Sequence, residues 1–462
     1  MQAHGYDRAV SGVASQRVQR LLTLENERFV AERPRSTAQL ERGRSSMPRG
    51  VPMSWMEELY EHPPVWVTHG NGASFWDIDG HRYLDLYIAD MSAFCGHAPE
   101  PVVRAVAERM RRGNQFLLPS EDAVPVADHL AGRYGMPKWQ FTLSATQANT
   151  EVIRIARHAT GRDVVMVFDG KYHGHVDATL AVLDDGVVQP EYYGLGRGAT
   201  DKTRIVAFND VAALQSALSS RDVAVVLAEP AMTNAGFLLP QPGFHAALRE
   251  LTVDAGTLLA IDETHTLVTA YGGLGREWGL QPDFVTVGKS IAGGVPLAAY
   301  GMTDEVASFL RAPDDPYVVS GMAVGEPATG GTLFANALSL AACRSALTEV
   351  LTEQAFAHTA KLGARLAAGL RDTFARQGLA WSVTQEGSHA YYAFTPTPPH
   401  DGATSRAADD PDLRALMRVF MANRGVWESG WWLGPTVSVA HTEADVDAYV
   451  EVLAEFVTTV TA

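Results

Sequence analysis

The middle of the chain alternates between two hydrophobic patterns from about residue 100 onwards. Four segments have apolar residues three or four positions apart, as amphipathic helices do: residues 99–113, 124–135, 146–161 and 242–256. Five short runs rich in β-branched residues begin near residues 163, 203, 222, 257 and 283. Strands that are apolar throughout and joined by helices are typical of a mainly parallel sheet covered on both faces. The pattern therefore predicts an α/β fold.

The N-terminal part of the chain has a less regular pattern. Residues 1–48 are rich in arginine, and their apolar residues are spaced too irregularly for a deep core. We interpret them as a helical arm or as a segment that wraps around another subunit. Residues 74–94 contain two strand-like runs on either side of Asp79 and Gly80. This dipeptide predicts a hairpin, because both positions of a tight turn must tolerate positive φ.

The pattern changes again after about residue 336. Long helical segments, a polar loop and a last strand and helix follow, which indicates a second, smaller α+β domain. We expect residues 1–95 to form the N-terminal arm and part of the small domain, and residues 336–462 to complete it. Residues 96–335 are expected to form the large domain.

The composition narrows the class of protein. The 462 residues carry a net charge of −16, so a general binder of nucleic-acid backbones, which needs a basic surface, is not expected. Two cysteines, Cys95 and Cys343, do not make a disulfide framework or suggest a metal site. No apolar stretch has the length of a signal peptide or a membrane span. We expect a cytoplasmic protein with no bound metal and no membrane partner.

Lysine is scarce among the 37 basic residues. The chain has only five lysines, at Lys138, Lys171, Lys202, Lys289 and Lys361. A coding bias toward arginine explains most of this imbalance, but it leaves few candidates for chemistry that needs an amine. Lys289 is distinctive because it follows the strand-like run FVTVG and precedes small residues. A lysine amine partly removed from water at a strand end loses its proton more readily and can condense with a carbonyl group, although surface lysines on loops are commoner.

Other polar residues also follow predicted strands, where the ligands of parallel sheets collect. Asp262 and Glu263 follow the apolar run TLLAI, and Asp262 lies 27 residues before Lys289. An isolated acidic pair at such a place is more often a solvated turn or a helix cap. Residues 144–146 join a strand to a helix and favour either a bound phosphate or an ordinary N-cap. The absence of a GxGxxG fingerprint or a Walker loop disfavours dinucleotides and nucleoside triphosphates.

In this order and spacing, the motifs resemble those of fold-type I pyridoxal-phosphate (PLP) enzymes. The resemblance is to class III aminotransferases, the group that includes glutamate-1-semialdehyde aminomutase and the ω-amine transaminases, and it covers residues 46–455. It implies a large domain with a mainly parallel seven-stranded sheet sandwiched by helices, and a smaller α+β domain built from both chain ends. It also implies a homodimer with active sites at the subunit interface.

The resemblance implies a role for each motif. Lys289 corresponds to the lysine that forms a Schiff base with PLP, and Asp262 to the acid that keeps the ring nitrogen protonated. The remaining cofactor-binding residues that it implies are the phosphate turn of Ser144, Ala145 and Thr146, the stacking ring of Tyr172, the acid Glu229, Thr264 on the opposite ring face, and Thr332, which reaches the phosphate of the neighbouring subunit.

The implied activity is transfer of an amino group between small molecules. We expect an aminotransferase that works by a ping-pong mechanism through pyridoxamine phosphate, passing the group from an amine or amino acid to a keto acid, aldehyde or ketone. The alternatives are a glutamate-1-semialdehyde-type 2,1-aminomutase, a decarboxylating transaminase, and a non-catalytic module that keeps the fold. The presence of both Lys289 and Asp262 argues against the last of these.

The sequence departs from the family pattern in two ways. The phosphate turn has Ala145 where the family has glycine and Gln147 where it has glutamate. The arginines that bind substrate carboxylates in the family are absent or displaced, with Arg49 and His441 as the remaining cation candidates. The same C-terminal region is rich in aromatic residues, namely Trp427, Trp431 and Trp432, with Tyr391 and Tyr392 upstream. We expect about half of these in the core and the rest around a pocket for an aryl or bulky apolar amine.

Overall fold

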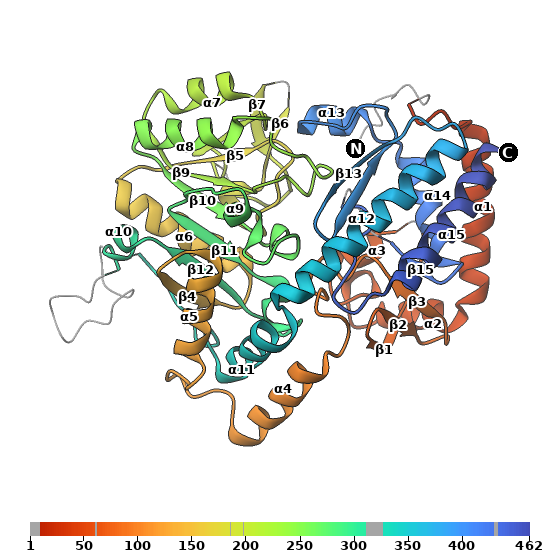
Figure 1. Cartoon of the computed structure of the whole chain (residues 1–462), viewed down its shortest axis with the longest axis horizontal. Helices are drawn as coiled ribbons and strands as arrows, with labels where there is room; N and C mark the ends of the chain where they lie inside the picture. Colours follow the sequence, from red (N-terminus) through yellow and green to blue (C-terminus); the bar gives the residue numbers. More distant parts are fainter. Residues whose placement is uncertain (1–9, 61, 185, 197, 311–326, 429–432) are drawn as a thin grey trace. The chain divides into compact units, whose positions relative to one another are not determined.

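The computed structural model describes residues 10–60, 62–184, 186–196, 198–310, 327–428 and 433–462 (Figure 1). These residues form two compact units. One unit takes its described residues from 1–99, 357–399 and 404–462, and the other takes them from 100–356 and 400–403. The first unit is therefore assembled from both ends of the chain. None of the helices in the described ranges combines the length and the apolar character that a bilayer span requires.

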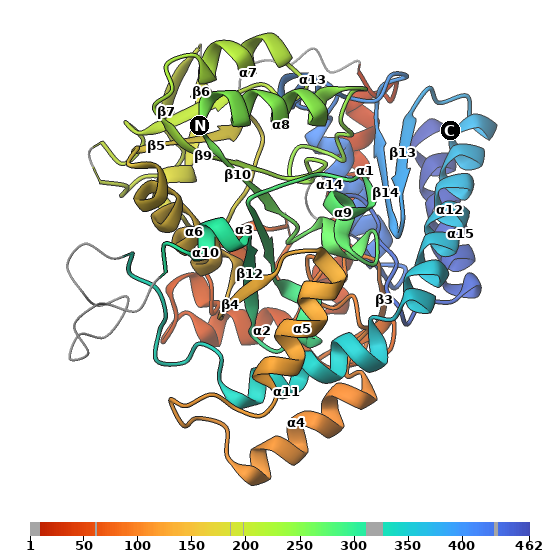
Figure 2. The same ribbon diagram turned by 60° about the vertical axis from the view of Figure 1, so that its left-hand side comes forward.

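A seven-stranded sheet lies at the centre of the second unit (Figures 1 and 2). Its strands, in the order in which they neighbour one another, are β4 (Lys138–Thr142), β12 (Ala298–Met302), β11 (Phe284–Val287), β10 (Leu258–Asp262), β9 (Val223–Ala228), β5 (Val164–Phe168) and β8 (Thr203–Val206). Only β12 runs antiparallel to its neighbours, β11 and β4. The predicted mainly parallel sheet is confirmed, and every residue of β9, β11 and β12 is buried, as a sheet covered on both faces requires.

Helices cover both faces of this sheet (Figure 2). The α-helices in the described part of the unit are α4 (Glu100–Arg112), α5 (Ala123–Tyr134), α6 (Ala145–Thr160), α7 (Val211–Leu218), α8 (Phe244–Ala255), α9 (Gly273–Glu277), α10 (Asp304–Ala307) and α11 (Ala337–Ser345). Three short 3₁₀ helices, η2 (Asp177–Thr179), η3 (Thr266–Val268) and η4 (Lys289–Ala292), and the π-helix η5 (Ala346–Val350) accompany them. Helix α6 packs its apolar side on one face of the sheet, and α7 and α8 pack on the other. A separate hairpin is formed by β6 (Ala181–Asp184) and β7 (Val187–Pro190).

The first unit contains a four-stranded sheet that joins the two ends of the chain. Its strands are β1 (Val67–Asn71), β2 (Ser74–Asp77), β3 (Arg82–Asp85) and β15 (Val426–Trp427). The remaining elements of the chain are α1 (Ser15–Glu32), α2 (Pro34–Gly43), η1 (Pro48–Gly50), α3 (Trp55–Glu58), α12 (Glu353–Arg376), β13 (Ser382–Glu386), β14 (His389–Ala393), α13 (Gly402–Ala407), α14 (Pro411–Ala422) and α15 (Glu443–Thr461). β15 pairs with β3 in parallel, so a C-terminal strand completes an N-terminal sheet.

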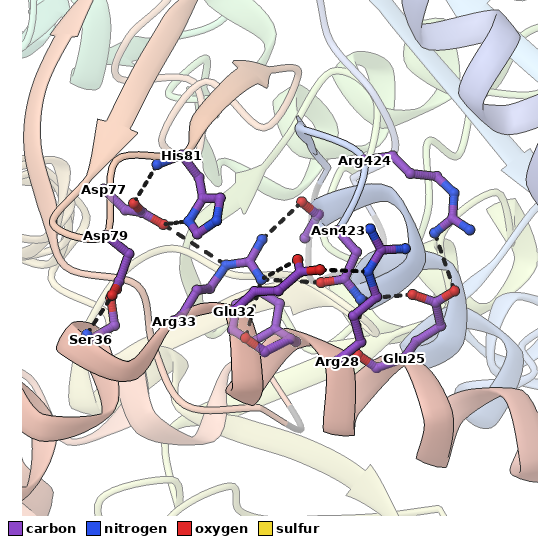
Figure 3. Close-up of polar contacts among 12 residues, drawn as sticks. Glu25, Arg28, Glu32, Arg33, Ser36, Asp77, Asp79, His81, Asn423 and Arg424 are labelled. Carbon is purple, nitrogen blue, oxygen red and sulfur yellow. Dashed lines mark hydrogen bonds and ion pairs between the residues drawn. The ribbon is translucent and has the colours of Figure 1, made fainter.

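The N-terminal helices belong to the core of the first unit, so the expectation that they lack deeply buried residues is wrong. Val18 and Phe29 of α1 are buried in its apolar clusters. Arg33, at the junction of α1 and α2, is only 2% exposed. Its Nε donates to the Tyr83 hydroxyl (2.6 Å), which in turn donates to Asp77 Oδ2 (2.7 Å). This buried charge is therefore paired and hydrogen-bonded, as burial demands (Figure 3).

The predicted hairpin at residues 74–94 is confirmed, but its turn differs from the expected one. β2 and β3 pair antiparallel, with Phe75 opposite Tyr83. Gly80 has a φ of 99°, whereas Asp79 does not have a positive φ. Instead, the Asp79 carboxylate accepts hydrogen bonds from the backbone N–H and hydroxyl groups of Ser36 at the start of α2 (Figure 3). Asp79 therefore caps a helix, a contact that the local pattern does not reveal.

Candidate active site

A pocket lies where several neighbouring strands of the seven-stranded sheet end. Its lining residues are Ala145, Tyr172, His173, Gly174, Glu229, Asp262, Thr264, His265 and Lys289. They follow the carboxyl ends of β4, β5, β9, β10 and β11. Six residues that the sequence singled out are thus brought together, because the carboxyl ends of parallel strands meet at one edge of the sheet.

Lys289 occupies a conformation that lysine rarely adopts. It follows β11 and Gly288, and its φ is 51°. Such positive φ values cost free energy in residues with a Cβ and cluster at functional sites. A Cβ added to Gly288 would lie 3.3 Å from the Cβ of Ala298 and 3.4 Å from that of Ala145. The glycine therefore lets the backbone before Lys289 approach the start of α6 closely.

Asp262 is buried and accepts four hydrogen bonds. Asn149 Nδ2 (2.8 Å) and His173 Nδ1 (2.9 Å) contact Oδ2, while the backbone N–H (3.0 Å) and hydroxyl (2.5 Å) of Thr264 donate to Oδ1. Burial by itself raises the pKa of this carboxyl, but the hydrogen bonds from His173, Thr264 and Asn149 outweigh it and lower the pKa to about 2. Asp262 therefore stays ionised at neutral pH.

Two of these partners were not assigned a role from the sequence. His173 adjoins the predicted stacking residue Tyr172, and Asn149 lies three residues after Thr146 of the predicted phosphate turn. Asn149 lies on the buried side of α6, and its Nδ2 also donates to the carbonyl oxygen of His173 (3.1 Å). A polar residue among the mostly apolar buried positions of α6 was the available signal, because buried polar groups need partners.

The start of α6 forms a well-defined N-terminus beside the pocket. Ser144 is the N-cap and accepts from the backbone N–H of Gln147 (3.4 Å), while Gln147 Oε1 accepts from the backbone N–H of Leu143 (3.1 Å). The amide oxygen of Gln147 thus accepts a hydrogen bond at the start of the helix, and this contact does not require the negative charge of a glutamate. Thr146 Oγ1 accepts from the backbone N–H of His175 (3.1 Å). The backbone N–H groups of the first turn and the helix dipole favour the binding of an anion at this end of α6.

Glu229 is part of a buried polar cluster behind Lys289. Its Oε2 accepts from the backbone N–H (3.1 Å) and the hydroxyl (2.5 Å) of Thr233. The same hydroxyl lies 2.6 Å from His265 Nδ1, and His265 Nε2 contacts Lys289 Nζ. Burial, assisted by the charge of Asp262, raises the pKa of Glu229 to about 8 despite the hydrogen bonds from Thr233. Neither Thr233 nor His265 was singled out from the sequence.

The other predicted site residues have different surroundings. Tyr172 lines the pocket and is 40% exposed, so one part of its ring remains accessible. Thr332 is on an exposed turn outside the lining, and its carbonyl oxygen accepts from Gln115 Nε2. Its predicted contact is to a neighbouring subunit, so that role stays a prediction.

The two remaining cation candidates are already engaged or neutral within the first unit. Arg49 pairs with Glu58 and lies 4.0 Å from a carboxylate oxygen of Glu57. His441 is buried, and burial lowers its pKa to about 4, so it carries no charge at neutral pH. We therefore correct the expectation that His441 supplies a cation.

The aromatic residues that were considered for a substrate pocket are mostly core residues. Trp427 packs edge-on against Tyr60, Phe75 and Tyr83, and Tyr391 and Tyr392 are buried. Tyr392 donates its hydroxyl proton to Glu428 (2.6 Å). Trp431 and Trp432 lie outside the described residues. The described members of this set thus support core packing and not a pocket for an aryl amine.

Comparison with known proteins identifies the family. The family model "Aminotransferase class-III" matches residues 56–394. A glutamate-1-semialdehyde 2,1-aminomutase from Thermus thermophilus is 34% identical over 91% of this chain and 99% of its own length. A glutamate-1-semialdehyde-aminomutase from Pseudomonas aeruginosa PAO1, solved in complex with PMP, is 37% identical, with a TM-score of 0.92 over 97% of this chain and 100% of that one.

A more distant structure has a different activity in its name. A β-phenylalanine aminotransferase from Variovorax paradoxus is 29% identical, with a TM-score of 0.84 over 96% of this chain and 97% of that one. Together with the sheet described above, these similarities confirm the fold-type I architecture that the motifs implied. The chain therefore belongs to the class-III aminotransferase family of enzymes.

Proposed function

We propose that the pocket at the strand ends holds PLP and that the enzyme uses it to move an amino group. The observation that carries this proposal is the convergence of Lys289, Asp262 and the start of α6 on one pocket. The chemistry of these groups fits the cofactor: an amine for its aldehyde, an ionised carboxylate for its ring nitrogen, and a helix N-terminus for its phosphate. The accessible ring of Tyr172 suits the flat pyridine ring.

Each residue has a distinct task in this proposal. Lys289 would hold the cofactor through its amine and would carry a proton to and from the substrate carbon. Asp262 remains ionised and so keeps the ring nitrogen protonated, while Thr264, Asn149 and His173 hold its carboxylate in place. When bound, the cofactor supplies an electron-accepting ring that stabilises negative charge on that carbon. Residues 144–146 hold the phosphate through backbone N–H groups.

The reaction that we favour is intramolecular, from one carbon to the neighbouring carbon of a single substrate, as in a 2,1-aminomutase. Several relatives and solved structures that are 32–38% identical to this chain and match most of it have this activity in their names. The expectation of a preference for aryl amines loses support, because Trp427, Tyr391 and Tyr392 are buried in the first unit. The aminomutase, first considered as the alternative, is therefore the leading assignment.

Product analysis tests this assignment. Purified enzyme is incubated with glutamate 1-semialdehyde in the absence of any other amine or keto acid, and the products are separated by mass spectrometry coupled to chromatography. An aminomutase converts the substrate to the isomer with the amino group on carbon 1, with no change in mass and no requirement for an acceptor. Conversion that depends on an added keto acid and yields one equivalent of a new amino acid contradicts the proposal.

Transfer between two different molecules is the second candidate. It is favoured by the similarity to the β-phenylalanine aminotransferase, whose fold matches over nearly the whole chain. In this case β-phenylalanine and a keto acid would both be consumed in equal amounts, and the first assay would give no isomer. The two assays together therefore separate the candidates.

We also propose that two copies of the chain associate. Phe116, Leu117 and Leu118 form a run of exposed apolar side chains, with Leu117 and Leu118 74% and 73% exposed. The adjoining Gln115 contacts the turn that holds Thr332 and the exposed Leu333. Exposed apolar patches of this kind usually mark interfaces, and this one lies beside the residue that the family resemblance assigns to the neighbouring subunit.

Replacement of both Leu117 and Leu118 by aspartate is expected to dissociate the dimer. Each copy of the chain loses two leucines, so the dimer interface loses four, at about 1.5 kcal/mol each. The total of about 6 kcal/mol weakens association about 10⁴-fold. Analytical ultracentrifugation over a range of concentrations measures the change. Val253→Asp is the matched control, because Val253 is an exposed apolar residue of α8 outside the patch. An unchanged dimer in the double variant would show that this patch is not the interface.

A further inference from the structure

Four side chains form a continuous line of polar contacts that begins at Lys289 and ends at Glu229. Lys289 Nζ contacts His265 Nε2, His265 Nδ1 lies 2.6 Å from Thr233 Oγ1, and that hydroxyl donates to Glu229 Oε2 (2.5 Å). The residues come from three strand ends, β9, β10 and β11. Glu229, Thr233 and His265 are all buried, so bulk water has little access to the line.

The contacts are compatible with a single direction of hydrogen bonding. Thr233 uses its one hydroxyl proton toward Glu229, so it accepts from His265 Nδ1–H. With its proton on Nδ1, the neutral imidazole presents Nε2 as an acceptor to the lysine amine. Each group thus donates to the next, from Lys289 to Glu229, which is the arrangement that allows a proton to move along the line.

The far end of the line is suited to hold a proton. Glu229 Oε1 is buried and has no hydrogen-bond partner among the described residues, an arrangement that costs least when the carboxyl is neutral. Burial and the nearby charge of Asp262 raise the pKa of Glu229 to about 8, so above about pH 8 the carboxyl is ionised and takes up a proton readily.

We propose that His265 and Thr233 form a proton relay that carries a proton from the Lys289 ammonium to Glu229. Lys289 gives a proton to His265 Nε2, His265 gives its Nδ1 proton to Thr233 Oγ1, and Thr233 gives its hydroxyl proton to Glu229 Oε2. No bond between heavy atoms changes, and an ammonium–carboxylate pair becomes a neutral amine and a neutral carboxyl. The relay rests on the proposed function, since it supplies the neutral amine that attacks a carbonyl carbon.

The other ionisable groups around the amine do not replace the relay. The pocket brings Asp262, His173 and Tyr172 near Lys289, in addition to His265 and Glu229. Asp262 is held ionised by its four hydrogen bonds and His173 is bonded to it, so neither is a ready proton acceptor. Tyr172 is partly exposed and belongs to the rim of the pocket. Glu229 is therefore the acid that His265 and Thr233 connect to the amine.

The test measures the rate at which Lys289 of the full-length protein is trapped by PLP and borohydride between pH 6 and pH 10. Peptide mass spectrometry reports attachment at Lys289 without any need for turnover. Thr233→Val removes the hydroxyl at nearly constant volume, and Glu229→Gln removes the proton acceptor. Both are expected to slow trapping about tenfold between pH 8 and pH 10, where Glu229 of the wild type is ionised and can accept the proton, and to leave trapping nearly unchanged at pH 6. Loss of the carboxylate charge alone would lower the pKa of the Lys289 ammonium and speed trapping, so slower trapping in Glu229→Gln points to the relay. Thr233→Ser keeps the hydroxyl and is expected to trap like the wild type.

The outcomes separate the relay from the proposed function. If the wild type does not attach PLP at Lys289, the proposed function fails. If the wild type attaches PLP and Thr233→Val follows the same pH profile, the relay is refuted while the proposed function stands. A slowing of trapping shared by Thr233→Val and Thr233→Ser indicates a packing effect and also refutes the relay. Should Thr233→Val fail to fold, the comparison of Glu229→Gln with the wild type decides the question.

Discussion

Lys289→Ala is expected to lower turnover by at least about 10⁴-fold, because it removes both the amine that binds the cofactor and the group that moves the proton. Lys289 is the only one of the five lysines among the residues that line the described pocket. The variant is also expected to lose the absorbance band of lysine-bound cofactor and to give no borohydride-stable adduct. Steady-state kinetics, absorbance spectra and peptide mass spectrometry measure these three effects.

Lys138→Ala is the matched control for this experiment. Its side chain is 58% exposed, and its Nζ lies 3.7 Å from Asp304 Oδ1. An ion pair that is this exposed contributes little to the stability of the protein. Lys171 is a poorer control, because its amine is buried and contacts the Ala181 carbonyl oxygen and Glu191. An adduct that still forms in Lys289→Ala would overturn the assignment of the catalytic lysine.

The central sheet could be predicted because its strands carry their own signal. β9 is apolar throughout, β10 is apolar up to Asp262, and a helix with regular apolar spacing separates them, so burial on both faces can be predicted from a single segment. β12 was missed, because its residues Ala298–Met302 include a glycine and only one long aliphatic side chain. A Cβ on Gly301 would lie 2.7 Å from the Trp139 ring of β4, so that glycine is explained by the neighbouring strand.

The N-terminal helices could not be placed because their partners are far away in the sequence. Arg33 resembles a solvated arginine in its local context, yet its guanidinium contacts Tyr83 and Asn423. Burial of such a group is favourable only when all of these partners are present together. The same holds for Asp79. Its place before a glycine predicts a tight turn, whereas the hydrogen bond that it accepts from Ser36 depends on a helix far away in the sequence.

The candidate site was predictable for residues that stand at strand ends and not for those that hold them. Asp262 and Lys289 differ in type from the apolar strands that precede them, which makes them visible. Asn149, Thr233 and His265 lie on a helix side or in loops, where a polar residue is ordinary. Their roles depend on distances between segments that only the folded chain defines.

Asp262→Asn is expected to lower kcat by about 10³-fold while the cofactor remains attached to Lys289. The amide has nearly the same shape but no charge, so the ring nitrogen is no longer held in its protonated form and negative charge on the substrate carbon loses its stabilisation. Both carboxylate oxygens accept hydrogen bonds, so the new NH₂ group faces hydrogen-bond donors in either orientation. These donors are Thr264 on one side and Asn149 with His173 on the other. The test compares kcat with the absorbance of bound cofactor and with borohydride trapping at Lys289.

Thr264→Val separates the charge of Asp262 from the hydrogen bonds that surround it. It removes the hydroxyl that donates to Oδ1 but leaves the backbone N–H of residue 264, His173 and Asn149 in place, so the carboxylate stays ionised. We expect less than about a tenfold loss of kcat, because the three remaining hydrogen bonds keep the carboxylate ionised and in place. A kcat for Asp262→Asn within tenfold of the wild type would mean that the ring nitrogen needs no anionic partner. Equal losses in both variants would instead assign the effect to the position of the carboxylate and not to its charge.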